Sequence, residues 1–241
     1  MRVIFFDTET TGGGKTDRLI QLAAKERGVK EPVVSAIFTP PVPISIESMA
    51  VHHITPKMVA GRPAFTDAEE FAALKELFES KDTIAVAHNV VFDTGMLAKE
   101  GIQVANPLCT YKVAAALDED GSIPTYQLQY LRHYFDLEID APAHDALGDV
   151  LVLEAVFEKL LAQLAEKMGS EEDALAAMLE ITNRPVLIVS FGFGKHRGKR
   201  VADVAREAPD YLEWLLAQKK QEPAGEENWI YTLEYHLGRR Q

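Results

Sequence analysis

The N-terminal part of the chain contains short apolar runs separated by polar turns and glycines. Residues 1–6 form one such run, rich in β-branched and aromatic residues, and residues 18–27 and 32–39 form two more. Runs of this kind are typical of buried strands. Gly28 lies in the short connection between the second and third runs, and short connections join antiparallel neighbours. The pattern predicts three early strands, and residues 83–88 predict another.

Later segments carry apolar residues at helical spacing. Helices are predicted over residues 66–80, 92–99, 111–117, 125–135 and 146–167. The proline-rich segment 40–63 is predicted to be a long irregular loop, and loops of that length are often functional. Strands first, followed by alternating helices and strands, indicate an α/β fold with a mixed sheet and helices on its faces.

The composition limits the classes of protein that fit. The chain has 241 residues, enough for one ordinary domain and a smaller unit. The single cysteine, Cys109, excludes an internal disulfide framework and a cysteine-based zinc site. No apolar run approaches the length of a membrane span, so we expect a cytoplasmic protein. A net charge of −12 argues against non-specific wrapping of nucleic acid, although bound divalent cations can locally reverse the sign of an acidic pocket.

Two acidic residues follow the first predicted strand, in the stretch Asp7-Thr-Glu-Thr-Thr-Gly12. Strand side chains alternate, so Asp7 and Glu9 are expected on one side and Thr8 on the other. Two neighbouring carboxylates repel each other unless a cation joins them. Asp-x-Glu is a short and common pattern, so a solvated strand end with two unrelated acids explains it equally well.

Two further stretches place acids and histidines at predicted element ends. His88-Asn-Val-Val-Phe-Asp93 lies where a strand meets a helix, the position at which open α/β sheets bind ligands. His144-Asp-Ala-Leu-Gly-Asp149 opens the long helix and puts Asp149 about one turn into it. Each has an ordinary alternative: Asn89 and Asp93 suit a helix start, and a histidine before a helix is commonly a surface residue.

Together these three motifs resemble those of DEDDh 3′-5′ exonucleases, in the same order. The resemblance covers residues 1–168 and extends to the segment 49–55. It implies a ribonuclease H-like fold with sheet order 3-2-1-4-5. It also implies a metal-dependent 3′-5′ exodeoxyribonuclease that prefers single-stranded DNA or a 3′ overhang and releases 5′-mononucleotides. The implied catalytic residues are Asp7, Glu9, Asp93, His144 and Asp149.

The chemistry of phosphodiester hydrolysis explains this set of residues. Two divalent ions can activate a water and stabilise the leaving oxygen. Carboxylate oxygens suit Mg²⁺, for which Mn²⁺ can substitute, and the four predicted ligands are Asp7, Glu9, Asp93 and Asp149. His144 would act as the general base, because the pKa of histidine lies near neutrality. A zinc hydrolase fits less well, because the seven histidines show no ligand-spaced pair beyond the adjacent His52 and His53.

Substrate contacts are expected around the same motifs. Backbone groups near Gly12 could approach the terminal nucleotide closely, and the resemblance places the segment 49–53 beside the nucleotide pocket. In an equally simple alternative, Met49 and Val51 only pack on the core. The predicted substrate-binding residues are Thr8, Thr10, Thr11, Gly12, Met49, His53, Asn89 and Phe92.

The C-terminal part of the chain is predicted to be a separate unit. We expect a connecting helix over residues 169–183 and a small module over residues 184–241, which resembles a C-terminal extension that some exonucleases of this family carry. Residues 184–200 contain five Lys or Arg and no Asp or Glu, and aromatic and basic residues interleaved in this way suit nucleic acid. The candidate DNA contacts are Lys195, Arg197, Lys199 and Arg200. The alternative is a solvated basic turn on a helical module with Tyr211, Trp214 and Leu215 as its core.

Two other functions remain open from the sequence. One is an exonuclease of the same family that is either RNA-directed, with RNA as its partner, or a replicative proofreading enzyme. The C-terminal extension is the sequence feature that argues against it. The other is a non-catalytic nucleic-acid-binding or polymerase-accessory module, against which the presence of all five catalytic positions argues. The oligomeric state does not follow from the sequence.

Overall fold

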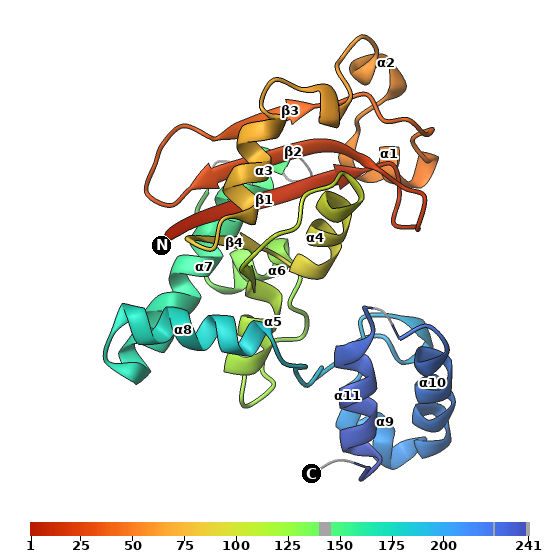
Figure 1. Ribbon diagram of the computed structural model, residues 1–241. Helices are drawn as coiled ribbons and strands as arrows, with labels where there is room; N and C mark the ends of the chain where they lie inside the picture. Colours follow the sequence, from red (N-terminus) through yellow and green to blue (C-terminus); the bar gives the residue numbers. More distant parts are fainter. Residues whose placement is uncertain (140–145, 224, 240–241) are drawn as a thin grey trace.

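The computed structural model describes residues 1–139, 146–223 and 225–239, and its centre is a five-stranded sheet (Figure 1). The strand order is β3-β2-β1-β4-β5, which confirms the expected mixed sheet. β1 is the middle strand, antiparallel to β2 and parallel to β4. The bounds are β1 Arg2–Thr10, β2 Leu19–Glu26, β3 Val34–Ile37, β4 Thr83–Ala87 and β5 Pro107–Cys109.

Both faces of β1 are buried, which explains its unbroken apolar run. Phe5 packs edge-on against Phe157 at a ring-centroid distance of 5.1 Å. On the opposite face Phe6 packs against Phe78 at 5.0 Å. Each phenylalanine belongs to a separate hydrophobic cluster. The sheet is therefore covered by helices on both sides, and the end of β1 is where polar residues can gather.

The helices follow the predicted periodicity, with several differences at their ends. They are α1 Ile46–His52, α2 Pro56–Val59, α3 Phe71–Glu79, α4 Val90–Lys99, α5 Thr110–Leu117, α6 Leu128–Tyr134, α7 Ala146–Met168, α8 Glu171–Thr182, α9 Val201–Glu207, α10 Pro209–Gln221 and α11 Glu227–His236, with the 3₁₀ turns η1 Phe65–Asp67 and η2 Gly194–His196. None of these helices is long and apolar enough to cross a bilayer.

Two of the expectations about local structure were wrong. The segment 40–63 is not a long irregular loop, because it forms α1 and α2. Ser45 caps α1, its hydroxyl accepting a hydrogen bond from the Ser48 N–H at 3.0 Å. The helix predicted from residue 66 begins at Phe71, and Asp67 lies in η1 before it. The polar cap at Ser45 marks the start of α1, and a window of apolar spacing does not detect such a cap. At α3 the 3₁₀ turn η1 takes up the first residues of the predicted helix, although the apolar spacing continues through them.

Helix α8 lies where a connecting helix was expected, but it is part of the main core. Its buried residues Ala174, Met178 and Ile181 pack in the cluster that surrounds Phe157. Arg27, in the turn after β2, makes ion pairs with Glu158 of α7 at 2.6 Å and with Glu171 of α8 at 2.5 Å. The helix therefore belongs to the same packed unit as α7.

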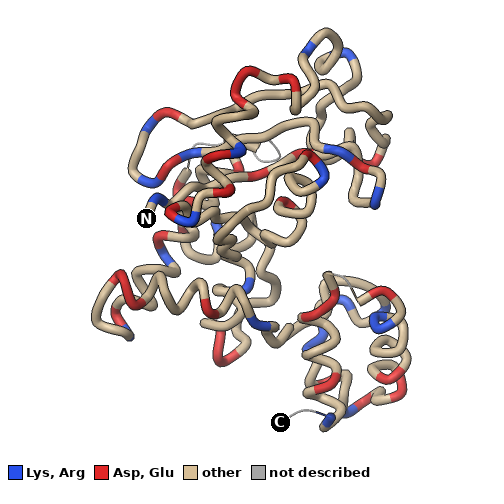
Figure 2. The backbone as a smooth tube through the Cα atoms, viewed as in Figure 1, with Lys and Arg blue, Asp and Glu red and all other residues tan. Residues whose placement is uncertain are grey.

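Residues after α8 form a small helical module with its own core. In Figure 1 the module, α9 to α11, lies apart from the sheet and follows a short connecting segment. Trp214, which the alternative of a solvated basic turn placed in this core, is 56% exposed, whereas Leu215 is buried. Figure 2 shows positions of Lys and Arg interspersed with positions of Asp and Glu along the module.

Candidate active site

Three acidic residues from two elements meet at the end of β1. Asp7 and Glu9 are half-buried on one side of the strand, and the alternate residues Thr8 and Thr10 are buried. Asp149 lies in the first turn of α7. One carboxylate oxygen from each of Asp7, Glu9 and Asp149 lies within 4.8 Å of the others. The structure therefore brings together three of the four predicted metal ligands.

This carboxylate cluster suits a divalent cation. Oxygen ligands are what Mg²⁺ and Mn²⁺ prefer, and three carboxylates at this separation repel one another unless a positive charge lies between them. One of the three also has a neutral partner: the side-chain amide Nε2 of Gln129 donates a hydrogen bond to Asp149 Oδ1 at 2.6 Å. Gln129 comes from the first turn of α6, and no sequence motif identified it.

Asp93, the fourth predicted ligand, lies beside the cluster and has other partners. Its Oδ1 accepts hydrogen bonds from the Thr8 backbone N–H at 3.1 Å and from the Thr8 hydroxyl at 2.7 Å. The residue is 4% exposed. Burial raises the pKa of the Asp93 carboxyl to about 7, although the hydrogen bonds from Thr8 lower it. Thr8, predicted as a substrate contact, is therefore the residue that orients Asp93.

His144, the predicted general base, lies outside the described residues. Of the other histidines near the site, His88 is held by two hydrogen bonds. Its Nε2 lies 2.7 Å from the Tyr126 carbonyl oxygen, and its Nδ1 lies 2.9 Å from the Thr110 hydroxyl. Burial lowers the pKa of His88 to about 4, so its ring is neutral at physiological pH and serves to join β4 to the start of α5.

The loop after β1 uses most of its polar groups internally. The Thr11 N–H donates to the Arg18 carbonyl at 2.9 Å, and the Thr11 hydroxyl donates to Asp17 at 2.8 Å. The Thr10 hydroxyl donates to the Gly12 carbonyl. A Cβ on Gly12 would lie 2.6 Å from the Asp17 carboxylate. A side chain at Gly12 would therefore displace the Asp17 carboxylate, which accepts hydrogen bonds from the Thr11 hydroxyl and the Gly14 N–H.

The segment 49–53 also turns toward β1 through a residue that the motifs did not single out. His52 is 6% exposed, and its Nε2 lies 3.2 Å from the Thr10 carbonyl oxygen while the Ile54 N–H donates to its Nδ1 at 2.9 Å. Met49 packs on the cluster around Ile20, whereas Val51, which the alternative also placed on the core, is 50% exposed. His53 is exposed, with a left-handed φ of 62° that ends α1.

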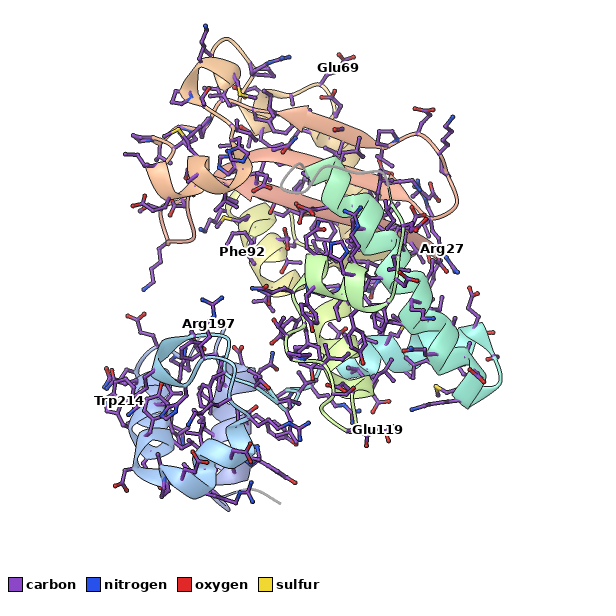
Figure 3. The ribbon with its side chains drawn as sticks, turned by 180° about the vertical axis from the view of Figure 1, so that it is seen from behind. Arg27, Glu69, Phe92, Glu119, Arg197 and Trp214 are labelled. Atoms are coloured by element: carbon purple, nitrogen blue, oxygen red, sulfur yellow. The ribbon has the colours of Figure 1, made fainter. Side chains whose placement is uncertain are left out.

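The start of α4 presents the remaining predicted contacts to solvent. Asn89 occupies the N-cap position with a φ of 64° and makes no capping hydrogen bond. A non-glycine residue in this conformation is strained, and such strain commonly occurs at functional sites. Phe92 follows, 37% exposed, and is labelled in Figure 3. Both side chains are therefore free of core packing on the helix that carries Asp93.

The candidate DNA contacts in the C-terminal module have different surroundings. Lys199 pairs with Glu207 at 3.3 Å, and the Arg200 guanidinium donates to the carbonyl oxygens of Asp120 and Gly121. Arg200 therefore fastens the module to the segment between α5 and α6. Lys195 lies 4.6 Å from the centroid of the Tyr211 ring, and Lys195 and Arg197 are both exposed.

The sheet order and an acidic cluster at the end of its first strand define a nuclease of the ribonuclease H-like fold. A model of an exonuclease family matches residues 4–157, and a model described as exodeoxyribonuclease X-like C-terminal matches residues 191–220. The chain belongs to this exonuclease family, and it is a phosphodiester hydrolase.

Particular relatives agree with that family. The chain is 32% identical to exodeoxyribonuclease 10 of Escherichia coli K12, over 90% of both chains. It is similar to a structure of exonuclease X in complex with 5′ overhanging duplex DNA, with a TM-score of 0.55, 26% identity and coverage of 75% of this chain and 99% of that one. An E. coli exonuclease I complex with a dT13 oligonucleotide shares the fold, with a TM-score of 0.57, 21% identity and coverage of 69% and 42%. The predicted resemblance to the exonuclease family, including the C-terminal extension that some of its members carry, is confirmed.

Proposed function

We propose that this protein is a metal-dependent 3′-5′ exodeoxyribonuclease that prefers single-stranded DNA and releases 5′-mononucleotides. The observation that carries the proposal is the cluster of Asp7, Glu9 and Asp149 at the end of β1. It occurs in a chain that is similar over 90% of its length to an exodeoxyribonuclease. A DNA substrate is supported by a relative whose structure contains an overhanging duplex, and the preference for single strands rests on the family resemblance.

The carboxylate cluster would hold two divalent ions, and Mg²⁺ is the ion that we expect there. Bound there, the ions would supply a water of lowered pKa and positive charge for the scissile phosphate. Asp7, Glu9 and Asp149 supply hard oxygen ligands. Asp93 would join them as a carboxylate, because a nearby cation lowers the pKa that burial has raised. Thr8 and Gln129 hold Asp93 and Asp149 in place through the hydrogen bonds described above.

Besides the metal ligands, the reaction requires a general base and residues that bind the 3′ end of the strand. We assign the base to His144, which precedes α7 and its Asp149 in the chain, since histidine accepts a proton near neutral pH. Asn89 and Phe92 at the start of α4 would contact the last nucleotide, with Met49 and His53 on the other side. In the C-terminal module, the exposed Lys195 and Arg197 would contact phosphates of the same strand.

A buried, free Cys109 supports a cytoplasmic location.

A degradation assay tests the function. A 5′-labelled single strand incubated with Mg²⁺ should shorten progressively from its 3′ end, and EDTA should prevent this. Asp7→Asn should lose nearly all activity, whereas Asp67→Asn, which neutralises an exposed acid in η1, should retain it. An undegraded strand with wild-type protein and Mg²⁺ would refute the proposal. Faster loss of matched RNA would instead identify an RNA-directed exonuclease.

A further inference from the structure

The exposed tryptophan of the C-terminal module lines two cavities. Trp214 is 56% exposed on α10, although burial of an aromatic ring of this size is strongly favourable. One cavity, of about 670 Å³, places Lys195 and Tyr211 beside it. A second cavity, of about 920 Å³, places Phe193 and Lys219 beside it. The indole therefore lies between two hollows, each of which contains a lysine and a second aromatic ring.

The module does not need this tryptophan for its own core. That core is built on Phe191, which stacks on Trp229 at a ring-centroid distance of 5.1 Å, together with buried leucines of α10 and α11. Trp214 contacts Tyr211 at 5.6 Å but is not a member of the buried cluster. A large ring that is exposed, next to a packed core that excludes it, is available to a ligand.

The second cavity also reaches the exonuclease domain. Lys15 is one of its lining residues, and Lys15 belongs to the loop that follows β1, the strand that carries Asp7 and Glu9. In Figure 3, Arg197 lies at the edge of the module that faces the exonuclease domain, and Trp214 lies on the flank beyond it. A strand that leaves the candidate active site along this loop would meet the module at the cavity.

We propose that Trp214 is a stacking platform for a base of single-stranded DNA whose 3′ end occupies the candidate active site. This inference rests on the proposed function and extends the substrate path across both parts of the chain. Lys195 on one side and Lys15 on the other supply charge for the phosphates that flank the stacked base. Aromatic rings with nearby cations are the usual means of binding single strands without sequence preference.

The charges around the platform favour a base over a free anion. Glu207 and Asp210 also line the first cavity, and Glu222 and Glu226 line the second. Lys219 is neutralised by Glu226, with a 2.5 Å ion pair. These carboxylates would repel an isolated phosphate or an acidic peptide, but they can accept hydrogen bonds from the amino groups of bases. The ring face itself offers no charge and accepts any base.

Binding without catalysis tests this path directly. Affinity for a labelled oligothymidylate of about 16 nucleotides, a length that single-strand-binding domains cover, is measured in EDTA by fluorescence anisotropy. Trp214→Ala should weaken binding roughly tenfold, and Trp214→Phe should weaken it less, because it keeps a ring. Tyr235→Ala on α11 is the matched control, since Tyr235 is 44% exposed and lines neither cavity; it should bind as the wild type does.

Salt dependence separates stacking from phosphate contact. Trp214→Ala should lower affinity equally at all salt concentrations, whereas Lys15→Ala should reduce the slope of log affinity against log salt. The chain has two tryptophans, so quenching of intrinsic fluorescence by the oligonucleotide should be present in the wild type and absent in Trp214→Phe. This measurement holds even if Trp214→Ala folds poorly.

Hydrolysis distinguishes failure of this inference from failure of the proposed function. The ratio of kcat/KM for the long strand to kcat/KM for a dinucleotide should fall in Trp214→Ala, because a dinucleotide cannot extend to the module. If the wild type hydrolyses both substrates but Trp214→Ala binds and degrades the long strand normally, the platform is refuted while the exonuclease stands. A changed oligomeric state in Trp214→Ala with unchanged DNA affinity would also overturn the inference, in favour of a second copy of the chain on this face.

Discussion

Replacing Glu9 by glutamine should stabilise the metal-free protein. One oxygen of each cluster carboxylate lies within 4.8 Å of the others, and at that distance two unit charges repel by about 3.5 kcal/mol at an effective dielectric constant of about 20, or by about 1 kcal/mol in water. Glu9→Gln keeps the shape of the side chain and removes two of the three repulsive pairs. Because the carboxylates are only half-buried, the lower limit applies, and we expect a gain of about 2 kcal/mol in the free energy of unfolding.

Thermal unfolding measures this effect with and without metal. In EDTA, a gain of about 2 kcal/mol corresponds to an increase of roughly 4–8 °C in Tm for a chain of this size. Mg²⁺ should then raise the Tm of the wild type by mass action and have little effect on Glu9→Gln, which has lost a ligand.

The control is Glu31→Gln, which neutralises an exposed acid in the turn between β2 and β3. Its Tm should change little and should respond to Mg²⁺ as the wild type does. If Glu9→Gln lowers the Tm in EDTA, or if Mg²⁺ stabilises it as much as the wild type, the cluster is not a strained cation site.

Three further predictions concern the supports of the site and the module. Burial lowers the pKa of His88 to about 4, from about 6.5 in the unfolded chain. The contribution of the neutral His88 to the free energy of unfolding is therefore fully present above pH 6.5 and is lost as the pH falls toward 4. Urea unfolding at several pH values should show a loss of about 3 kcal/mol in the free energy of unfolding, and His88→Asn should reduce that loss. Gln129→Ala, which removes the hydrogen bond to the cluster, should raise the Mg²⁺ concentration for half-maximal activity roughly tenfold, and an unchanged Mg²⁺ titration would contradict that role. Gly121→Ala should weaken the contact between Arg200 and the carbonyls of Asp120 and Gly121, because Gly121 has a φ of 62° and a Cβ there would lie 2.7 Å from Val189 and 2.8 Å from Arg200. Limited proteolysis should then cut the segment after α8 faster than in the wild type.

Local pattern determined the part of the site that lies along single elements. Asp7 and Glu9 share one side of β1 because side chains alternate along any strand. Asp149 lies about one turn into α7 because it is the fourth residue of a helix that begins at Ala146, and a turn takes about 3.6 residues. The continuous apolar run before Asp7 identified β1 as a strand buried on both faces, as the Phe5 and Phe6 contacts show. Ordered motifs then indicated the family, which the comparisons confirm.

Only the tertiary structure decided which groups meet across elements. Asp93 lies on α4, as predicted, and its carboxylate accepts hydrogen bonds from the N–H and the hydroxyl of Thr8. Thr8 can make these contacts because it lies in the part of β1 that extends past the residues paired with β4. His52 and Gln129 act through contacts with residues 42 and 20 positions away in sequence, and no local spacing reveals such pairs. β5 has three residues, too few for a period to register, and it came only from the family resemblance.

The C-terminal module shows the same division. The sequence indicated a helical module whose core would include Leu215, and Leu212, Leu215 and Leu216 of α10 are buried. Spacing alone does not say how far the buried stripe extends around a helix, because its edges depend on which neighbours cover them. α9 and α11 cover the leucines and leave Trp214 outside. The sequence therefore determined that an aromatic, basic module follows the nuclease, and the packing of three helices decided that its tryptophan faces solvent.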